Sequence, residues 1–472
     1  MEDSDLRPFL DWAETTLDAR VVRCERQGER RSGGRPAFFI DFDRAGEKIP
    51  TYARMDRGDG QLVGKAFGLD REHRILKALN EQGLRVPVVH GFCEAPRGIL
   101  MENVEGDFDY TALAPGPTRD ALDRDFLEEL VRVHRIDPSV WTAIGLSAPQ
   151  TAEETALSDL ALWERTYRLA LRQPVPLVEF ATRWLRRNVP PSPERLSLVQ
   201  GDTGPGQFIF RGPKVAAIID WEFAHLADPI LDLAQIRTRD FYNPGADMTA
   251  WIQTYAELAG LPIDETKLRY YTVKSMLITP LALAGVVQNM APQTDHAEWF
   301  AQDVTYKRAS AEALGEALGV PLTPPEIPTG RTDDAGVPSS TLASIGPRAL
   351  LDLLDHNLRE EHGPAAPDGY ARYRIDLALR LVAHLRNVTS LGAELERLET
   401  EDRAALLDAA TGSEAASEAA LLRRIEAEDP SDDQALVAYL YRRAVREEAL
   451  WRGGLGVGET ARLQPVRISS SA

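Results

Sequence analysis

The chain has little cysteine: only Cys24 and Cys93 occur among its 472 residues. Neither belongs to a metal-binding CxxC pair, and two cysteines do not make a disulfide framework, so a reducing compartment is expected. No uninterrupted apolar stretch has the length of a membrane helix, because the most apolar segment, 276–287, is broken by Thr279 and Pro280. The N-terminal residues are acidic and mixed, without the basic and apolar order of a secretory signal. We therefore expect a cytoplasmic protein without membrane contact.

The sequence is also poor in basic residues relative to acidic ones. Lys and Arg total 54 against 73 Asp and Glu, which gives a net charge of −19. Such an acidic chain is an unfavourable partner for polyanions, so no nucleic-acid binding is expected. Hydrophobic residues at 43% and charged residues at 27% are typical of a folded globular protein. The length exceeds what one core usually organises, which predicts two or three folding units.

Five β-type runs, broken by glycines and by one helical segment, occupy the first 105 residues. The runs span 21–24, 37–42, 49–55, 87–92 and 98–104. Between the third and fourth runs, Ile75, Leu76 and Leu79 share one face of a helix that Gly83 ends. This pattern predicts a small antiparallel sheet with one helix.

Helical patterns dominate beyond residue 105, except in the β-rich block 196–221. A strand-rich part followed by a helical part predicts the α+β class. The segment 320–340 is rich in Pro, Gly, Ser, Thr and Asp and lacks periodicity, which is typical of an interdomain linker. Helical periodicity then returns and predicts a further all-α domain. The expected domains are an N-terminal lobe at 1–105, a helical lobe at 106–320, a linker at 321–341 and a helical domain at 342–460.

Two carboxylates lie at the two ends of a predicted β-hairpin. Asp202 lies in a polar, Gly-rich loop before one strand, and Asp220 directly follows the next strand. Such a pair suits phosphoryl transfer, because one carboxylate can orient an acceptor hydroxyl and take its proton while the other holds Mg²⁺ against nucleotide phosphates. Asp is also common in turns and at strand ends, so either residue alone has a purely structural interpretation.

An ordered motif across this hairpin resembles the aminoglycoside phosphotransferase and choline kinase-like family. That family's pattern is H-G-D-x-x-x-x-N, then a strand, then [IV]-D-[WF]-E. The matching segments are 200–202, Gln207, 219–222, 228–229 and 232–234. By this resemblance Asp202 is the catalytic base, Asp220 is the principal metal ligand, and Asp232 is a structural acid. The resemblance covers about residues 20–320 and implies a protein-kinase-like two-lobed fold that uses ATP and Mg²⁺.

The N-terminal lobe supports the same resemblance with less specific motifs. In that family, a glycine-rich turn offers backbone N–H groups to phosphates. The strand after the turn carries a basic residue, and the helix carries the acidic partner of that residue. The backbone of the connection between the lobes binds the edge of the adenine. The residues that the resemblance assigns to nucleotide binding are Gly33, Gly34, Arg54, Glu72, Glu102 and Val104. A glycine pair alone is also typical of a simple hairpin turn, and charged residues such as Arg54 and Glu72 are often solvated.

The motif departs from the family pattern at two positions. Gln200 stands where the family has His, at a position that is largely architectural and that tolerates another hydrogen-bonding side chain. Gln207 stands where the family has a metal-binding Asn. Its carbonyl oxygen lies on a stem one methylene longer, which shifts or weakens one metal site or leaves Gln207 as a remnant of lost chemistry.

Two functions are therefore expected from different classes. The first is an ATP-dependent phosphotransferase that moves the γ-phosphate to a hydroxyl of a small molecule. The second is a catalytically silent nucleotide-binding pseudokinase or scaffold that acts through its helical C-terminal domain, which offers a surface for a homodimer or a protein partner. The helices after residue 236 carry no readable code for the acceptor. The resemblance to kinase modules fused to acyl-CoA dehydrogenases suggests a hydroxylated acid or an acyl thioester.

Overall fold

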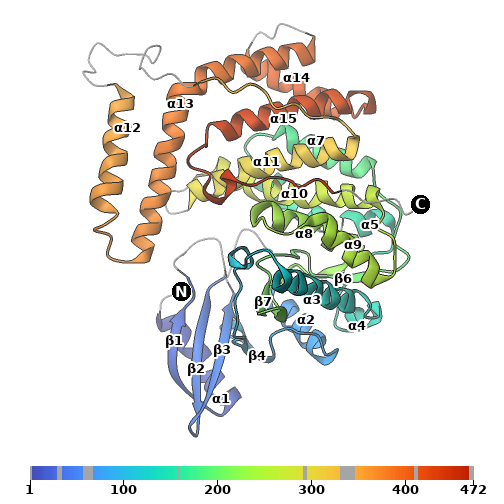
Figure 1. Cartoon of the computed structure of the whole chain (residues 1–472), viewed down its shortest axis with the longest axis vertical. Helices are drawn as coiled ribbons and strands as arrows, with labels where there is room; N and C mark the ends of the chain where they lie inside the picture. Colours follow the sequence, from blue (N-terminus) through green and yellow to red (C-terminus); the bar gives the residue numbers. More distant parts are fainter. Residues whose placement is uncertain are drawn as a thin grey trace. The chain divides into compact units, whose positions relative to one another are not determined.

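The N-terminal part of the chain folds into one antiparallel sheet. The computed structural model describes residues 3–28, 35–56, 67–157, 159–290, 295–329, 346–408 and 413–466. The strands of the sheet lie in the order β1-β2-β3-β5-β4 (Figure 1). They are β1 (Arg20–Arg26), β2 (Ala37–Arg44), β3 (Glu47–Met55), β4 (Val89–Glu94) and β5 (Arg97–Glu102). Each strand overlaps one of the five predicted β-type runs.

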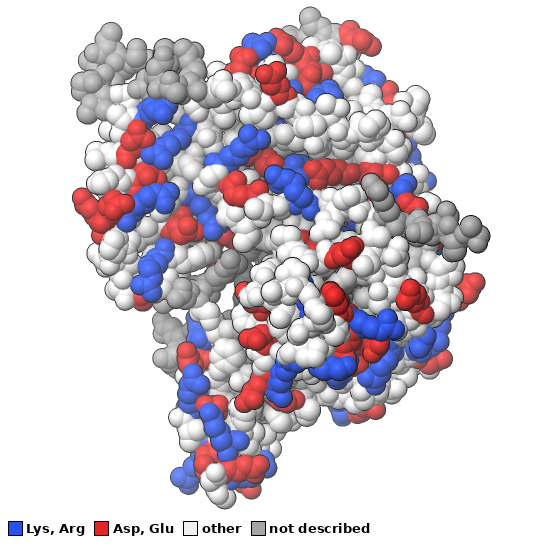
Figure 2. Space-filling model, viewed as in Figure 1, with Lys and Arg blue, Asp and Glu red and all other residues white. Residues whose placement is uncertain are grey.

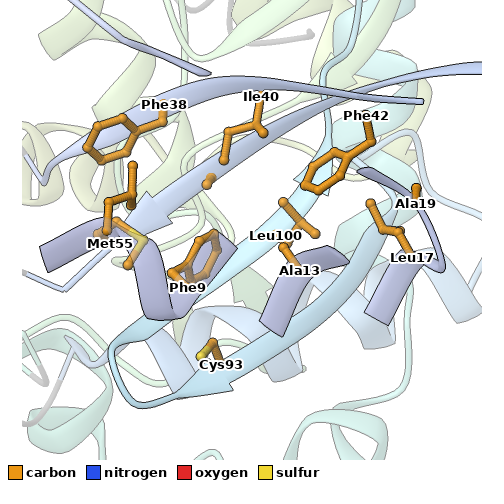
Figure 3. Packing of buried hydrophobic residues seen from close by; sticks show 12 residues of the cluster. Phe9, Ala13, Leu17, Ala19, Phe38, Ile40, Phe42, Met55, Cys93 and Leu100 are labelled. Carbon is orange, nitrogen blue, oxygen red and sulfur yellow. The ribbon is translucent and has the colours of Figure 1, made fainter. Parts of the chain in front are cut away.

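A helix that was not predicted covers one face of this sheet. Phe9, Ala13 and Leu17 of α1 (Asp3–Leu17) pack against sheet residues such as Ile40 (Figure 3). The expectation of a single helix in this lobe was wrong, because Pro8 and the acidic residues of α1 weaken its local helix signal. Burial of an apolar face with helical spacing on the sheet outweighs that local preference.

The other face of the sheet borders a cavity. Phe39, Tyr52 and Met101 lie opposite one another on β2, β3 and β5, and all three line the cavity. Side chains alternate between faces along a strand, so Arg54, two residues after Tyr52, points to the cavity as well. The alternation places the core on one face and the candidate site on the other.

One helix lies between β3 and β4 of the first sheet, and further helices and two short two-stranded sheets follow that sheet. The predicted helix is observed as α2 (Leu69–Glu81). The other helices that fold with the first sheet in one compact unit are α3 (Pro117–His134), α4 (Pro138–Ala143), α5 (Ala152–Leu157), α8 (Ile230–Tyr242) and α9 (Met248–Ala259), with a short 3-10 turn η2 (Tyr110–Ala112). The short sheets pair β6 (Ser197–Val199) with β9 (His225–Ala227) and β7 (Phe208–Arg211) with β8 (Lys214–Ile218). The α+β class is confirmed.

The chain divides into two compact units. The first comprises Met1–Ser158, Pro190–Tyr271 and Gln464–Ala472, and the second comprises Asp159–Val189 and Thr272–Leu463. The predicted four-part division into 1–105, 106–320, 321–341 and 342–460 stays a prediction, because compactness groups helices by packing and does not separate the first sheet from the helices that follow it.

The second unit is helical. Its helices are α6 (Leu160–Ala170), α7 (Pro176–Arg187), α11 (His296–Leu318), α12 (Pro347–His356), α13 (Gly369–Leu407), α14 (Glu414–Glu426) and α15 (Asp433–Ala449), with η3 (Asn357–His362), η4 (Pro430–Asp432) and η5 (Gly456–Glu459) as short turns. α11 packs along α15, and Arg308 donates to Glu448 at 2.9 and 2.8 Å. A helix before the predicted linker and a helix after it therefore share one core. The described part of that linker, 321–329, has no helix or strand.

One helix, α10 (Glu265–Gln288), extends from the first unit into the second. Its length and composition would allow it to cross a membrane, although 72% of its most apolar window is buried inside the protein. A buried core helix meets the same criterion, so this is weak support for a membrane segment.

Figure 2 shows acidic and basic side chains interspersed over one face of the molecule.

We expect Phe9→Ala to lower the free energy of unfolding of the N-terminal sheet by about 3–5 kcal/mol, since Phe9 is fully buried in the sheet core. Val22→Ala, at a side chain that is 61% exposed on β1, should change it by less than about 0.5 kcal/mol. Hydrogen–deuterium exchange in increasing urea measures this stability for the sheet amides alone. Equal stability of the two variants would contradict the place of α1 in the core.

Candidate active site

The β7–β8 hairpin brings the two ends of the motif together. Ile219 N–H donates to the carbonyl of Gln207 at 2.9 Å, which places Gln207 beside the residue that precedes Asp220. Asp220 has a φ of 61°, in the left-handed region that non-glycine residues rarely adopt. Backbone strain of this kind persists where the surrounding structure fixes it and is common at functional sites. Both Gln207 and Asp220 line the cavity beside the sheet.

A buried carboxylate holds the loop that carries Asp202. Asp232, in the first turn of α8, is fully buried and accepts from Gln200 N–H at 3.0 Å, Gly201 N–H at 3.1 Å and the Thr203 hydroxyl at 2.5 Å. His134 Nε2 lies 3.0 Å from the same carboxylate. Asp232 thus fixes successive residues of the loop at one point, which agrees with the structural role that the resemblance implies.

Gln200 links the loop to the strand that ends at Asp220. Its side-chain amide donates to the carbonyl of Ile219 at 2.6 Å. Gln200, which stands where the family pattern has His, therefore forms a hydrogen bond between the two halves of the motif. Gly201 is required next to it, because its φ is +83° and a Cβ there would lie 2.7 Å from the carbonyl oxygen of Phe223.

The carboxylate of Asp202 is held by two side chains. Arg239 of α8 donates through Nε to Oδ1 at 2.7 Å and through Nη2 to Oδ2, and Gln207 Nε2 donates to Oδ2 at 2.6 Å. Burial raises the pKa of Asp202 to about 6 against the opposing charge of Arg239, and the nearby Asp220 charge adds to the increase. Asp202 and Asp220 are therefore close enough to interact electrostatically, as expected for one site.

Arg54 connects the sheet, α2 and the hairpin. Its Nη1 donates to Glu72 at 2.6 Å and to Asp220 at 2.8 Å, and its Nη2 lies 3.5 Å from Glu222. Burial opposes the charge of Arg54, but the three carboxylates outweigh it and hold its pKa well above the ordinary value. Burial likewise opposes ionisation of Asp220, yet Arg54 lowers its pKa. Burial raises the pKa of Glu72, with Arg54 opposing.

Sequence reasoning missed three charged residues of the site. Arg35 donates through Nε to Glu222 at 2.9 Å and through Nη1 to Asp56 at 3.3 Å, so it holds the acid two positions after Asp220. Arg35 directly follows the predicted glycine pair, and Glu222 is the acid of the D-W-E motif, so both lay within patterns already recognised. Arg239, the third, belongs to no motif.

Most of the predicted site residues line a cavity of about 500 Å³. Arg54, Glu72, Glu102, Val104, Gln207 and Asp220 all line it. Asp202 does not line it but contacts Gln207, which does. Gly33 and Gly34 lie outside the described residues, so their predicted role stays a prediction. Apolar side chains such as Ile209 and Ile219 complete the wall.

The donor set beside this cavity fits Mg²⁺. The carboxylate of Asp220 and the side-chain carbonyl of Gln207 are hard oxygen donors of the kind that Mg²⁺ prefers. Gln207 uses its amide nitrogen on Asp202, which leaves the carbonyl oxygen for another contact. No group of three or more His, Cys, Asp or Glu among the described residues is arranged to hold a metal. Mg²⁺ at nucleotide sites needs only one or two carboxylates, because phosphates and water supply the remaining ligands.

The family model described as the phosphotransferase enzyme family matches residues 50–271. This segment contains Arg54, Glu72, the hairpin and α8, which build the site described above. Residues 50–271 belong to the phosphotransferase enzyme family. The matched segment includes β3 to β5 of the first sheet, the two short sheets and helices of both units, and additional helices follow it toward the C-terminus.

Curated relatives match the same half of the chain. Acyl-CoA dehydrogenase family member 11 of Rattus norvegicus is 28% identical over 254 residues, which are 51% of this chain and 31% of that protein. Acyl-CoA dehydrogenase family member 10 of Mus musculus is 30% identical over 218 residues, which are 42% of this chain and 20% of that protein. The chain thus spans less than a third of the length of these relatives.

Solved structures of phosphotransferases are similar at lower identity. The macrolide 2'-phosphotransferase MphH of Brachybacterium faecium is 18% identical with a TM-score of 0.43, over 60% of this chain and 91% of that chain. The GDP complex of aminoglycoside 2'-phosphotransferase-IIIa is 16% identical with a TM-score of 0.47, over 66% of this chain and 99% of that chain.

We expect Asp232→Ala to lower the free energy of unfolding by about 3 kcal/mol or more, because it leaves two backbone N–H groups of the loop before β7 without an acceptor. Asp247→Ala is the matched control, because Asp247 only caps α9 at an exposed position and its loss should cost about 1 kcal/mol. Urea denaturation measures both. Equal losses in the two variants would show that Asp232 does not organise the loop.

Proposed function

We propose that this phosphotransferase transfers the γ-phosphate of ATP to the hydroxyl group of a small molecule. The observation that carries the proposal is the convergence of Asp202, Gln207 and Asp220 at the ends of one hairpin, beside a cavity that also contains Arg54. Phosphoryl transfer needs positioning and charge neutralisation more than covalent chemistry, and this arrangement offers both.

The cavity has features that suit a nucleotide. Apolar side chains of the sheet and of the hairpin form walls for a flat base. Within the described residues, neither the N–H nor the carbonyl of Val104 forms a hydrogen bond, so both remain for the adenine edge. Arg54, which also lines the cavity, would bind phosphate oxygens, with Glu72 fixing its orientation.

Asp202 is the proposed base, and Asp220 with Gln207 would hold Mg²⁺. Bound Mg²⁺ neutralises the charge of the phosphates, which favours the transfer. Asp202 takes the proton of the acceptor hydroxyl as the hydroxyl oxygen bonds to the γ-phosphorus. The bond between that phosphorus and the oxygen of the leaving ADP breaks, and its electron pair stays with ADP. Asp202 thus holds the transferred proton, and no further reactant is needed.

The acceptor class remains part of the proposal. The relatives are named acyl-CoA dehydrogenases but are matched over less than a third of their length. That association supports testing hydroxylated acids and acyl thioesters first, with amino alcohols and sugars as comparison acceptors. Among the described residues of the helices that follow α8, we identify no feature that selects among these acceptors.

We expect MgATP to stabilise the wild-type protein, by about 2.7 kcal/mol at a concentration 100 times its Kd, with most of the effect lost in excess EDTA. Asp220→Ala should lose the Mg²⁺-dependent part of this stabilisation. Asp202→Ala should keep it but lower kcat about 10²–10⁴-fold, because only the proton acceptor is removed. Thermal shift and release of labelled ADP measure the two properties.

Asp137→Ala is the control for both measurements, since Asp137 only caps α4 at an exposed position. It should bind and turn over MgATP like the wild type. Stabilisation by MgATP without phosphate transfer to water or to any acceptor would contradict the proposal and support the silent nucleotide-binding function. The absence of stabilisation by MgATP or MgGTP would contradict both.

A further inference from the structure

Arg239 reaches Asp202 from a different element than the motif that carries Asp202. It lies near the C-terminal end of α8, 37 positions after Asp202 in the sequence. Its planar guanidinium spans both carboxylate oxygens, which is the fork geometry that Lys cannot reproduce. The contact therefore fixes the plane of the carboxylate as well as its position.

One face of α8 supports the whole loop before β7. Asp232 holds the loop at Gln200 and Gly201, whereas Ile236 and Arg239 lie against Gly204, where an added Cβ would be 3.2 Å from Ile236 Cα and 2.9 Å from Arg239 Cβ. Ile236 lies four positions after Asp232, and Arg239 lies three positions after Ile236, so the three residues share one face of the helix. Of the three, Arg239 donates hydrogen bonds to the proposed base.

The hydrogen bonds leave one side of Asp202 available. An ionised carboxylate offers about four lone-pair positions. Among the described residues, Oδ2 accepts from Arg239 and Gln207, whereas Oδ1 accepts only from Arg239 Nε. The remaining acceptor position is therefore on Oδ1. The carboxylate is 24% exposed and the Arg239 side chain 26%, so an acceptor molecule can reach the pair.

We propose that Arg239 is a positioning residue for phosphoryl transfer, which holds Asp202 so that Oδ1 faces the acceptor hydroxyl. This inference rests on the proposed function. Arg239 acts through Asp202 and does not line the nucleotide cavity. Its removal therefore changes the chemical step most, whereas the binding of MgATP, which it affects only through the charge that also lowers the pKa of Asp220, changes little.

The test compares Arg239→Ala and Arg239→Lys with wild type in MgATP turnover, with water as the acceptor and then with the best acceptor found. Arg239→Ala lowers kcat about 10–100-fold, the cost of a misplaced catalytic group, while the KM for MgATP stays within about twofold. Arg239→Lys keeps the positive charge without the fork geometry, so its kcat lies between those of wild type and Arg239→Ala. Added guanidinium chloride at millimolar concentration restores part of the kcat of Arg239→Ala but not of Arg239→Lys.

A double-mutant cycle separates positioning from a merely structural role. If Arg239 acts through Asp202, the Asp202→Ala/Arg239→Ala double variant has the same kcat as Asp202→Ala, within about twofold. Arg124→Ala, which removes an exposed guanidinium from α3, is the matched control and leaves kcat unchanged. Should Arg239→Ala fail to fold, the cycle is completed with Arg239→Lys, which keeps the charge on α8.

Four results would each overturn the inference. Two concern kcat: additive losses in the double-mutant cycle, or an unchanged kcat in Arg239→Ala. The other two are a KM for MgATP that rises in parallel with the loss of kcat, and no rescue of Arg239→Ala by guanidinium. These results differ from failure of the proposed function. If Asp202→Ala itself keeps wild-type turnover, Asp202 is not the base and the proposed function fails. If Asp202→Ala loses turnover and Arg239→Ala does not, only the role of Arg239 is wrong.

Discussion

The candidate site depends on a buried carboxylate that does not line the cavity itself. Asp232 accepts hydrogen bonds from two consecutive backbone N–H groups and a hydroxyl of the loop before β7. A buried charge is stable only when such donors surround it, so the loop and the start of α8 must fold together. With the loop fixed, Gln200 can reach Ile219, and the hairpin can then present Asp202 and Asp220 to one place.

The second constraint is electrostatic. Asp202, Asp220, Glu72 and Glu222 lie within a small, partly desolvated volume, where like charges oppose one another. Arg54 compensates three of these acids and Arg239 compensates Asp202. Acids that need compensating cations in the free protein are suited to receive a divalent cation. A nucleotide phosphate would compete for Arg54, so binding of MgATP would exchange one set of ion pairs for another.

The five strands, α2 and the hairpin could be predicted from the sequence because each has a local pattern, such as alternation along strands or glycines at turns. Asp202, Gln207 and Asp220 could be placed in one site because a spaced motif joins them. Local patterns failed where tertiary packing decides the structure. α1 contains Pro8 and acidic residues, and only the sheet that it covers makes it a core helix. Arg239 has no motif, because its contact with Asp202 arises from the helix that Asp232 anchors.

We propose that Asp202 and Asp220 act on one magnesium-bound triphosphate. A crystal structure with Mg²⁺ and a non-hydrolysable ATP analogue tests it most directly. The account predicts the triphosphate in the cavity beside Arg54, Mg²⁺ on the carboxylate of Asp220, and the terminal phosphate facing Asp202 Oδ1. A nucleotide bound outside this cavity, or a terminal phosphate directed away from Asp202, would contradict it.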